Sequence, residues 1–235
     1  MLAAENVWRT LAHQRVLRGI DLTVPAGGGV AILGPNGAGK STFMRVLAAV
    51  LRPQRGCARI FGEDPWASPE VRRKIGFAGH EPMLYGGLTT LENLQFFLCL
   101  YGLPDGHARA DAVCDLLGIR RRHDPVRILS RGMQQRAALA RAIVHRPQVL
   151  LLDEALTGLD PEAAQSLYEF LGAFRAAGGV VVLTTHSPGE ALRVADRAYV
   201  LARGRLSDAQ ALAGLNEEDV EAWYRATLAG VEPRA

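Results

Sequence analysis

Short apolar runs alternate with amphipathic stretches along most of the chain. Ile20, Leu22 and Val24 alternate with polar residues, which predicts a half-exposed strand in an antiparallel β lip near the N-terminus. The runs Val149–Leu152 and Val180–Thr184 are almost continuously apolar, as in strands that helices bury on both faces. Further strands are predicted at Val30–Leu33, Ala58–Phe61, Ile75–Ala78 and Tyr199–Ala202. The pattern therefore predicts an α/β fold with a mostly parallel core sheet.

The segment 88–146 has a helical pattern instead and contains no convincing strand. Thr89-x-x-Glu92 has the form of a capping box, which opens a helix through Leu100. Other helices are predicted at Ala108–Leu117 (stopped by Gly118), Ser130–Val144 and Asn216–Leu228. We therefore expect a single domain over residues 1–235. Its parts are an α/β core (1–87 and 147–210), an inserted helical subdomain (88–146) and a C-terminal helix (211–235).

Composition and charge narrow the class of protein. The 235 residues are 49% hydrophobic, which is enough for a sizeable core. A net charge of +3 gives no reason to expect a nucleic acid partner. No run approaches the ~20 apolar residues that span a bilayer, so work at a membrane would require docking onto another subunit. Cys57, Cys99 and Cys114 form no C-x-x-C pair and are expected to be small core residues of a reduced, cytosolic protein.

The stretch 34–42 carries the most specific chemistry in the chain. It satisfies G-x-x-x-x-G-K-[ST], between the strand Val30–Leu33 and a helix predicted over Thr42–Val50. Its glycines let backbone N–H groups point at phosphate oxygens, and the following helix adds its positive N-terminal end. Lys40 brings a cation to the terminal phosphates, and Ser41 offers a hydroxyl to Mg²⁺. The alternative is a chance glycine-rich turn, which the flanking elements disfavour.

Two carboxylates, Asp153 and Glu154, end the apolar strand that begins at Val149. Ligands of open α/β sheets sit at the carboxyl ends of strands, so Asp153 is predicted to hold Mg²⁺, directly or through water. Glu154 is predicted to polarise a water for attack on a γ-phosphate. The alternative is that either acid merely caps the following turn.

Two further groups stand at positions that suit phosphate chemistry. Ser130 and Gly132 open the third helix of the inserted segment, and a helix N-terminus is a second anion site. His186 follows the strand Val180–Thr184 at its carboxyl end. A lone histidine is more often structural, but this position favours a role in catalysis.

Together these residues resemble the ATP-binding cassette (ABC) ATPases over essentially the whole chain. The matching motifs are Gly34–Thr42 (Walker A), Val149–Asp153 with Glu154 (Walker B), Leu129–Met133 with Gln134, Gln135 and Arg136 (signature), Gly158–Asp160 (D-loop) and His186 (switch histidine). The resemblance implies a P-loop NTPase of the ABC type, with ATP and Mg²⁺ as cofactors. It implies the catalytic residues Glu154, His186 and Lys40, and the metal site Ser41, Asp153 and His80. It implies nucleotide binding by Gly34, Pro35, Asn36, Gly37, Ala38, Gly39, Lys40, Ser41, Thr42, Ser130, Gly132 and Asp160.

The resemblance also implies two partners. A second copy of the chain would form a head-to-tail dimer, with each ATP between the Walker A loop of one copy and the Ser130 region of the other. The family uses closure of this dimer to move transmembrane partners. We therefore expect a peripheral protein at the cytoplasmic face of the inner membrane, bound to an integral membrane permease.

The chain departs from the family pattern at four places. His80 stands where the family has the Q-loop glutamine, and a neutral imidazole can accept a hydrogen bond from metal-bound water. Ala155 replaces the proline after the catalytic glutamate, and Arg131 and Met133 replace a glycine and a glutamine of the signature. The aromatic residue that stacks on adenine has no clear counterpart, since Trp8 is expected to lie in the core.

One segment suggests a subtype. His80 with Leu84–Phe97 and Leu100–Gly102 resembles CcmA, the haem-exporter ATP-binding subunit of bacterial cytochrome c biogenesis. This resemblance implies haem export or release and a CcmB-like membrane partner. The alternative is an ATP-binding subunit of an ABC-2 type multidrug or other exporter, because those subunits share much of the segment. A soluble cassette ATPase of translation or DNA repair, or a module that does not hydrolyse ATP, is disfavoured.

Overall fold

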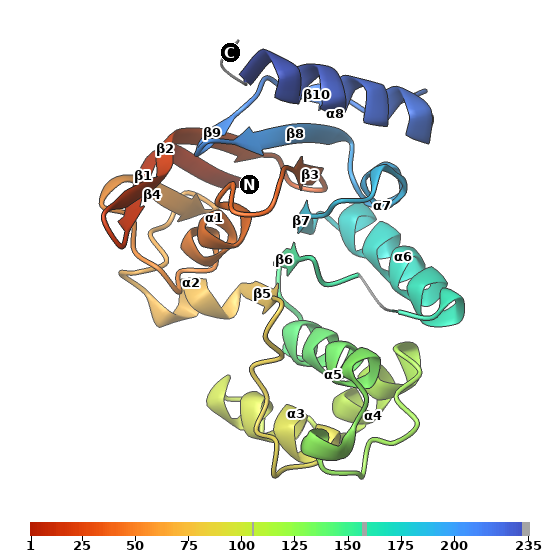
Figure 1. Ribbon diagram of the computed structural model, residues 1–235. Coiled ribbons are helices and arrows are strands. Elements are labelled where there is room, and N and C mark those ends of the chain that lie inside the picture. The colour runs from red at the N-terminus through yellow and green to blue at the C-terminus, as the bar shows by residue number, and fades with distance from the viewer. Residues whose placement is uncertain (105, 157–158, 232–235) are drawn as a thin grey trace.

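The computed structural model describes residues 1–104, 106–156 and 159–231, and its strands form a smaller and a larger sheet (Figure 1). The smaller sheet is antiparallel in the order β2-β1-β4, with β1 Leu2–Leu11, β2 Gln14–Val24 and β4 Arg55–Ile60. The larger sheet has the order β10-β8-β3-β7-β6-β5, and β9 pairs with β8. Its strands are β3 Gly29–Leu33, β5 Ile75–Ala78, β6 Val149–Asp153, β7 Val180–Thr184, β8 Arg197–Ala202, β9 Arg205–Leu206 and β10 Gln210–Ala211.

The helices fall between and after these strands. They are α1 Lys40–Leu47, α2 Pro69–Arg73, α3 Thr90–Leu100, α4 His107–Leu116, α5 Arg131–Ile143, α6 Pro161–Ala176, α7 Pro188–Val194 and α8 Glu217–Val231, with a short 3₁₀ turn, η1, at Val126–Ile128. Strands β5, β6, β7, β3 and β8 run parallel to their neighbours, and only the additions at β8 are antiparallel. The predicted α/β fold with a mostly parallel sheet and an antiparallel lip is confirmed.

Helix α1 lies between the two sheets and fills the space there. Its side chains Phe43 and Leu47 are fully buried against residues of both sheets, including Leu22 of β2 and Leu151 of β6. Burial of one such side chain stabilises the fold by roughly 1.5–3 kcal/mol. The helix was predicted over Thr42–Val50 but spans Lys40–Leu47. It ends early because the chain turns into the left-handed region at Ala49, with φ 56°.

Strand β6 is buried on both faces, as its continuous apolar run predicted. Val149 and Leu151 face the core that contains α1, whereas Leu150 and Leu152 face the helices on the opposite side. The helical segment shares this second core: side chains of α3, α4 and α5 pack in one cluster with β6 and β7. Figure 1 shows α3, α4 and α5 gathered at the end of the molecule opposite α8.

Two of the inserted helices, α3 and α5, begin at the caps that the sequence predicted. Thr89 and Glu92 form a reciprocal capping box at the start of α3, and Ser130 caps α5. Helix α4 ends before Gly118, whose φ of 61° suits glycine. The 3₁₀ turn η1 was not predicted, because three residues carry no periodic signal.

Helix α8 covers the sheet beside β8, as Figure 1 shows. Val220 is fully buried in a cluster with Ala31 and Leu33 of β3, and Trp223 packs against the same cluster. Asn216 caps the helix by accepting a hydrogen bond from the Asp219 amide at 3.0 Å, as predicted. The boundary expected at residue 211 falls within β10. None of the helices in the described ranges is long and apolar enough to cross a bilayer.

Two expectations about individual side chains were wrong. Trp8 is only half-buried on the small sheet, where its indole N–H donates to Asn6 Oδ1 at 2.7 Å. Among the cysteines, Cys114 is buried, but Cys57 is half-buried and Cys99 is exposed. The local sequence pattern does not decide whether Trp8, Cys57 and Cys99 are buried, because their burial depends on which face of each element the neighbouring elements cover.

Candidate functional site

The loop between β3 and α1 forms one wall of a cavity of about 560 Å³. Gly37 and Gly39 have φ of 79° and 106°, a region that glycine tolerates best. A Cβ on Gly34 would lie 2.3 Å from the Leu201 carbonyl oxygen, so only glycine fits there. The lining also includes Asn36, Ser41, Thr42, Arg45, Val16 and His80. The loop is therefore curled around a space large enough for phosphate groups.

Lys40 lies at the base of this loop and is only 5% exposed. Its Nζ donates to the carbonyl oxygens of Gly34 (2.7 Å) and Pro35 (3.3 Å). Glu154 Oε1 lies 3.4 Å from the same Nζ. Burial lowers the pKa of Lys40, while the carboxylates of Glu154 and Asp153 partly offset this effect. A buried cation thus faces the cavity with anionic groups beside it.

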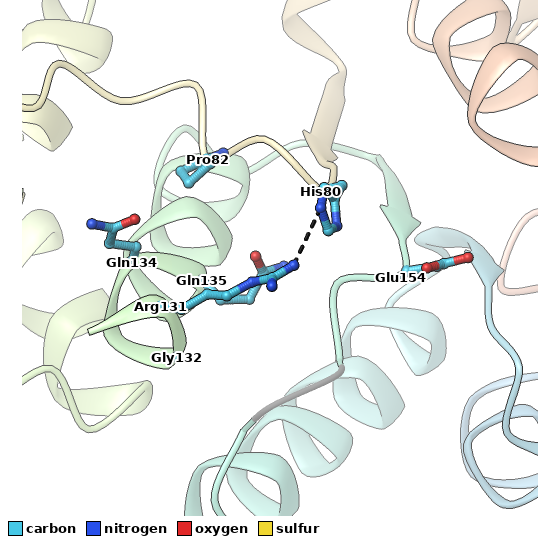
Figure 2. Close-up of a pocket in the computed structure, with 7 residues that line it drawn as sticks. All are labelled: His80, Pro82, Arg131, Gly132, Gln134, Gln135 and Glu154. Carbon is cyan, nitrogen blue, oxygen red and sulfur yellow. Dashed lines mark hydrogen bonds between the residues drawn. The ribbon is translucent and has the colours of Figure 1, made fainter. Parts of the chain in front are cut away.

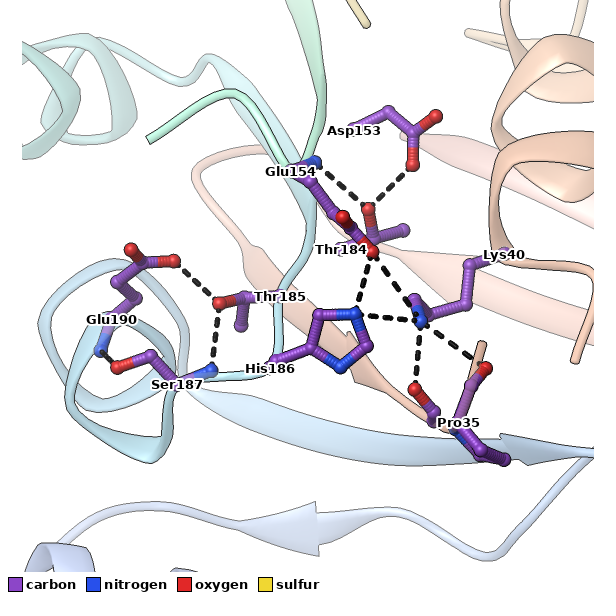
Figure 3. A network of polar contacts seen from close by, with 10 residues as sticks. Pro35, Lys40, Asp153, Glu154, Thr184, Thr185, His186, Ser187 and Glu190 are labelled. Carbon is purple, nitrogen blue, oxygen red and sulfur yellow. Dashed lines mark hydrogen bonds and ion pairs between the residues drawn. The ribbon is translucent and has the colours of Figure 1, made fainter. Parts of the chain in front are cut away.

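Glu154 and His186 complete this cluster (Figure 3). His186 Nε2 lies 2.8 Å from Glu154 Oε1 and 3.3 Å from Lys40 Nζ. Glu154 has φ 55°, an uncommon conformation for a residue with a side chain. The turn after β6 thereby places its carboxylate beside Lys40 and the histidine from the end of β7.

Asp153 is held by a residue that sequence reasoning missed, Thr184. The Thr184 hydroxyl donates to Asp153 Oδ1 at 2.6 Å and accepts from the Glu154 amide at 3.1 Å (Figure 3). Asp153 is 3% exposed and lines the cavity together with Ser41. A carboxylate and a hydroxyl are oxygen donors that suit Mg²⁺ shared with phosphates. In the described part of the chain, no group of three or more His, Cys, Asp or Glu side chains is arranged to hold a metal ion by itself.

The start of α5 borders a second cavity, of about 820 Å³ (Figure 2). Its lining includes Arg131 and Gly132 of α5, with Glu154 on the far side. Ser130 is exposed, and its hydroxyl caps α5 through the Met133 amide. Gln135, which belongs to the signature resemblance, donates to the Ala155 carbonyl at 3.2 Å. The Gln135 side chain of α5 therefore contacts the turn that follows β6.

The predicted site residues divide into two groups within one chain. Those that line the phosphate cavity or contact its lysine are Pro35, Asn36, Gly37, Gly39, Lys40, Ser41, Thr42, His80, Asp153, Glu154 and His186, with Gly34 and Ala38 in the same loop. Ser130, Gly132 and Asp160 do not line that cavity. Asp160 caps α6 and forms an ion pair with Arg136. Of the predicted D-loop, Gly158 lies outside the described residues.

The chain matches known protein families and curated relatives over most of its length. Residues 17–157 match the ABC transporter family, and residues 122–193 also match an AAA domain family. The daunorubicin/doxorubicin resistance ATP-binding protein DrrA of Streptomyces peucetius is 42% identical over 82% of this chain and 59% of its own length. A Nod factor export ATP-binding protein I of Ralstonia nicotianae is 35% identical over 87% of this chain and 65% of its own length. This chain thus spans about three fifths of the length of those relatives. NatA of Bacillus subtilis is 34% identical over 87% of this chain and 85% of its own length.

Solved structures are similar over nearly the whole chain. The ATP-binding subunit of an ABC transporter has a TM-score of 0.86 and 28% identity, covering 96% of this chain and 99% of its own. A dimeric cassette in a post-hydrolysis state with ADP and Pi has a TM-score of 0.78 and 26% identity, covering 92% and 100%. The likeness therefore extends to the core sheet, the inserted helices and the phosphate loop together.

Proposed function

The chain belongs to the ABC transporter family, and we propose that it is the ATP-hydrolysing subunit of a membrane exporter. The observation that carries the proposal is the cluster at the phosphate loop, where Lys40, Glu154 and His186 lie within 3.4 Å of one another. A buried cation, a carboxylate and an imidazole at the mouth of a phosphate-sized cavity suit transfer of a phosphoryl group to water.

The residues of one chain supply most of the chemistry. Loop amides and Lys40 would bind the β- and γ-phosphates, and Glu154 would take a proton from the attacking water. His186, hydrogen-bonded to Glu154, would orient that carboxylate. Ser41 and Asp153 would hold Mg²⁺, which neutralises developing phosphate charge when it is bound.

A second copy of the chain is part of the proposal. Ser130, Gly132 and Asp160 lie outside the phosphate cavity of their own chain, so a partner's copies of these residues could close it. The N-terminus of α5, with thirteen residues behind it, presents amide donors and a positive dipole end to an anion. The similar dimeric cassette with ADP and Pi supports this arrangement.

The membrane partner is proposed to dock on an apolar surface made by Tyr85, Phe96 and Leu100. Their exposed fractions are 54%, 37% and 61%, and the rings of Tyr85 and Phe96 are in edge contact with centroids 5.0 Å apart. Exposed apolar groups at one place commonly mark an interaction site. Replacing Leu100 with serine is expected to weaken co-purification of the chain with its membrane subunit from detergent. Val50→Ser, at another exposed apolar position, serves as the control.

The similar proteins favour the ABC-2 type alternative over haem export. DrrA is named for resistance to daunorubicin and doxorubicin, and the Ralstonia protein is named for Nod factor export. We therefore propose export of an amphipathic small molecule rather than haem, with a permease that is not of the CcmB kind. Stimulation of ATP hydrolysis in proteoliposomes distinguishes the two: an anthracycline should stimulate the complex, and haem should not. The reverse result would restore the haem proposal.

Hydrolysis itself is tested with the purified chain. Phosphate release from MgATP is measured for the wild type, Glu154→Gln and Glu169→Gln. Glu169 is an exposed acid on α6 that accepts a hydrogen bond from Gln165 and does not line the phosphate cavity, so its variant should keep the wild-type rate. Loss of the proton acceptor in Glu154→Gln should lower the rate by about 10²–10⁴-fold. Equal rates in the two variants would remove Glu154 from the mechanism.

A further inference from the structure

His80 and Arg131 are two of the positions at which the sequence departs from the family pattern, and the structure brings them into contact. His80 lies in the loop after β5, and Arg131 is the first residue of α5. Arg131 Nη2 lies 3.2 Å from His80 Nε2, across 51 residues of sequence. Figure 2 shows the guanidinium reaching toward the ring, with Glu154 on the far side of the cavity. The two departures are therefore one structural feature.

The chemistry of the two side chains fixes the direction of this hydrogen bond. A guanidinium carries only donors, so Arg131 must donate and His80 Nε2 must accept. An imidazole nitrogen accepts only when it carries no proton, which places the proton of the neutral ring on Nδ1. A doubly protonated ring would offer no acceptor and would set two cations against each other.

The position of the ring makes its tautomer matter. His80 lines both cavities, with Lys40 and Asp153 in the first and with Arg131 and Glu154 in the second. A metal ligand needs a ring nitrogen with a free lone pair. Arg131 engages the lone pair of Nε2, and Nδ1 carries the proton. Neither nitrogen is then available to a metal ion or to the proton of a metal-bound water.

We propose that Arg131 holds His80 in the Nδ1–H tautomer, so that the ring serves the phosphate cavity as a hydrogen-bond donor and not as a metal ligand. The group it suits is an anionic oxygen, such as a phosphate oxygen of a nucleoside triphosphate. This role rests on the proposed function, whereas the tautomer does not. It replaces the role that the resemblance implied, in which His80 joins Ser41 and Asp153 around Mg²⁺.

The tautomer is measured directly by ¹⁵N NMR of the histidine rings in the full chain. The chain has six histidines, and loss of one set of signals in His80→Gln assigns the ring. The wild type should show an unprotonated Nε2 and a protonated Nδ1. Arg131→Lys keeps a donor-only side chain and should preserve this pattern, whereas Arg131→Gly should shift the proton toward Nε2. A protonated Nε2 in the wild type, or no change in Arg131→Gly, would overturn the proposal.

Metal preference gives an independent readout of the same idea. Imidazole nitrogen favours Co²⁺ over Mg²⁺, so a ring released by Arg131→Gly should raise the ratio of hydrolysis rates with Co²⁺ and Mg²⁺. The expected rise is on the order of tenfold, and Arg131→Lys should show none. Arg127→Ala, at an exposed arginine of η1, is the control for loss of surface charge.

An unchanged ratio of the Co²⁺ and Mg²⁺ rates in Arg131→Gly contradicts the proposal. Failure of the wild type to hydrolyse ATP with any metal would instead count against the proposed function, and the NMR result would still decide the tautomer.

Discussion

Glu154 has a backbone conformation that is uncommon for a residue with a side chain. Its φ of 55° lies in the left-handed region, and its amide donates to the Thr184 hydroxyl at 3.1 Å. Such conformations persist only where the surroundings over-determine them, and they gather at functional sites. Here the fixed amide turns the chain at the end of β6, and the carboxylate consequently meets Lys40 and His186.

Lys40 is the residue whose removal should most weaken nucleotide binding. Lys40→Ala deletes a buried cation, and hydrogen bonds to charged groups contribute about 1.5–3 kcal/mol, so affinity for MgATP should fall by on the order of 10- to 100-fold. Isothermal titration calorimetry measures this change. Lys74, the chain's other lysine, pairs with Glu63 at the surface, and Lys74→Ala is the matched control. Equal affinity in both variants would contradict a phosphate role for Lys40.

At the scale of elements, α5 links the inserted helices to the parallel sheet. Arg141 donates to the Phe77 carbonyl of β5 at 2.6 Å, and His145 Nε2 lies 3.1 Å from the Ile75 carbonyl of the same strand. The ring of Tyr101, just after α3, stacks on His145 at 4.0 Å. Helix α5 and the residues after it are therefore hydrogen-bonded to β5, the strand that leads into the loop of His80. These contacts connect the proposed docking surface with the phosphate cavity.

The buried His145 should make stability depend on pH. Burial lowers its pKa to about 4, below the ordinary 6.5. Between these values the unfolded chain binds a proton that the folded chain does not, so the free energy of unfolding falls as the pH decreases from about 6.5 to 4. The slope from this group reaches about 1.4 kcal/mol per pH unit. Urea denaturation at several pH values should show a shallower decline for His145→Gln. His123→Gln, at an exposed position, should follow the wild type, and an unaltered slope in His145→Gln would refute the expectation.

The capping box of α3 offers a test of an element that sequence alone located. Thr89→Ala removes the hydroxyl that accepts from the Glu92 amide at 3.1 Å. The free energy of unfolding should fall by about 1 kcal/mol, measured by chemical denaturation. Thr227→Ala removes a hydroxyl that donates to the Trp223 carbonyl within α8, so a change below about 0.5 kcal/mol is expected there. An equally small change in the free energy of unfolding for Thr89→Ala would mean that the capping box does not stabilise α3.

At the scale of the whole molecule, we propose that the ATP site is divided between two copies of the chain. Glu154→Gln should bind ATP without rapid turnover and accumulate the closed dimer. Size-exclusion chromatography with light scattering measures its mass in MgATP. The double variant Lys40→Ala/Glu154→Gln should remain monomeric, because nucleotide is what joins the copies. A monomeric Glu154→Gln in saturating MgATP would argue against the head-to-tail arrangement.

The sequence by itself determined the core strands, the longer inserted helices and the position of the phosphate chemistry. Caps such as Thr89, the period-two pattern of β2 and the apolar run of β6 are local signals, so they predicted structure without knowledge of neighbours. Asp153 and Glu154 were placed beside the phosphate loop because the carboxyl ends of parallel strands meet at one edge of a sheet. The sequence predicted helix ends only approximately. The end of α1, for example, was placed too late because no residue type in the sequence marks the turn at Ala49.

Tertiary structure alone decided the contacts between distant segments. The support of Asp153 by Thr184, the pairing of Arg131 with His80, and the exposure of Cys99 each depend on how separate elements pack. Such contacts leave no periodic trace in either segment, because each side chain satisfies local rules in many different folds. The sequence identified the candidate reacting groups. The packing of distant segments determined which atom or face of each group points into the site.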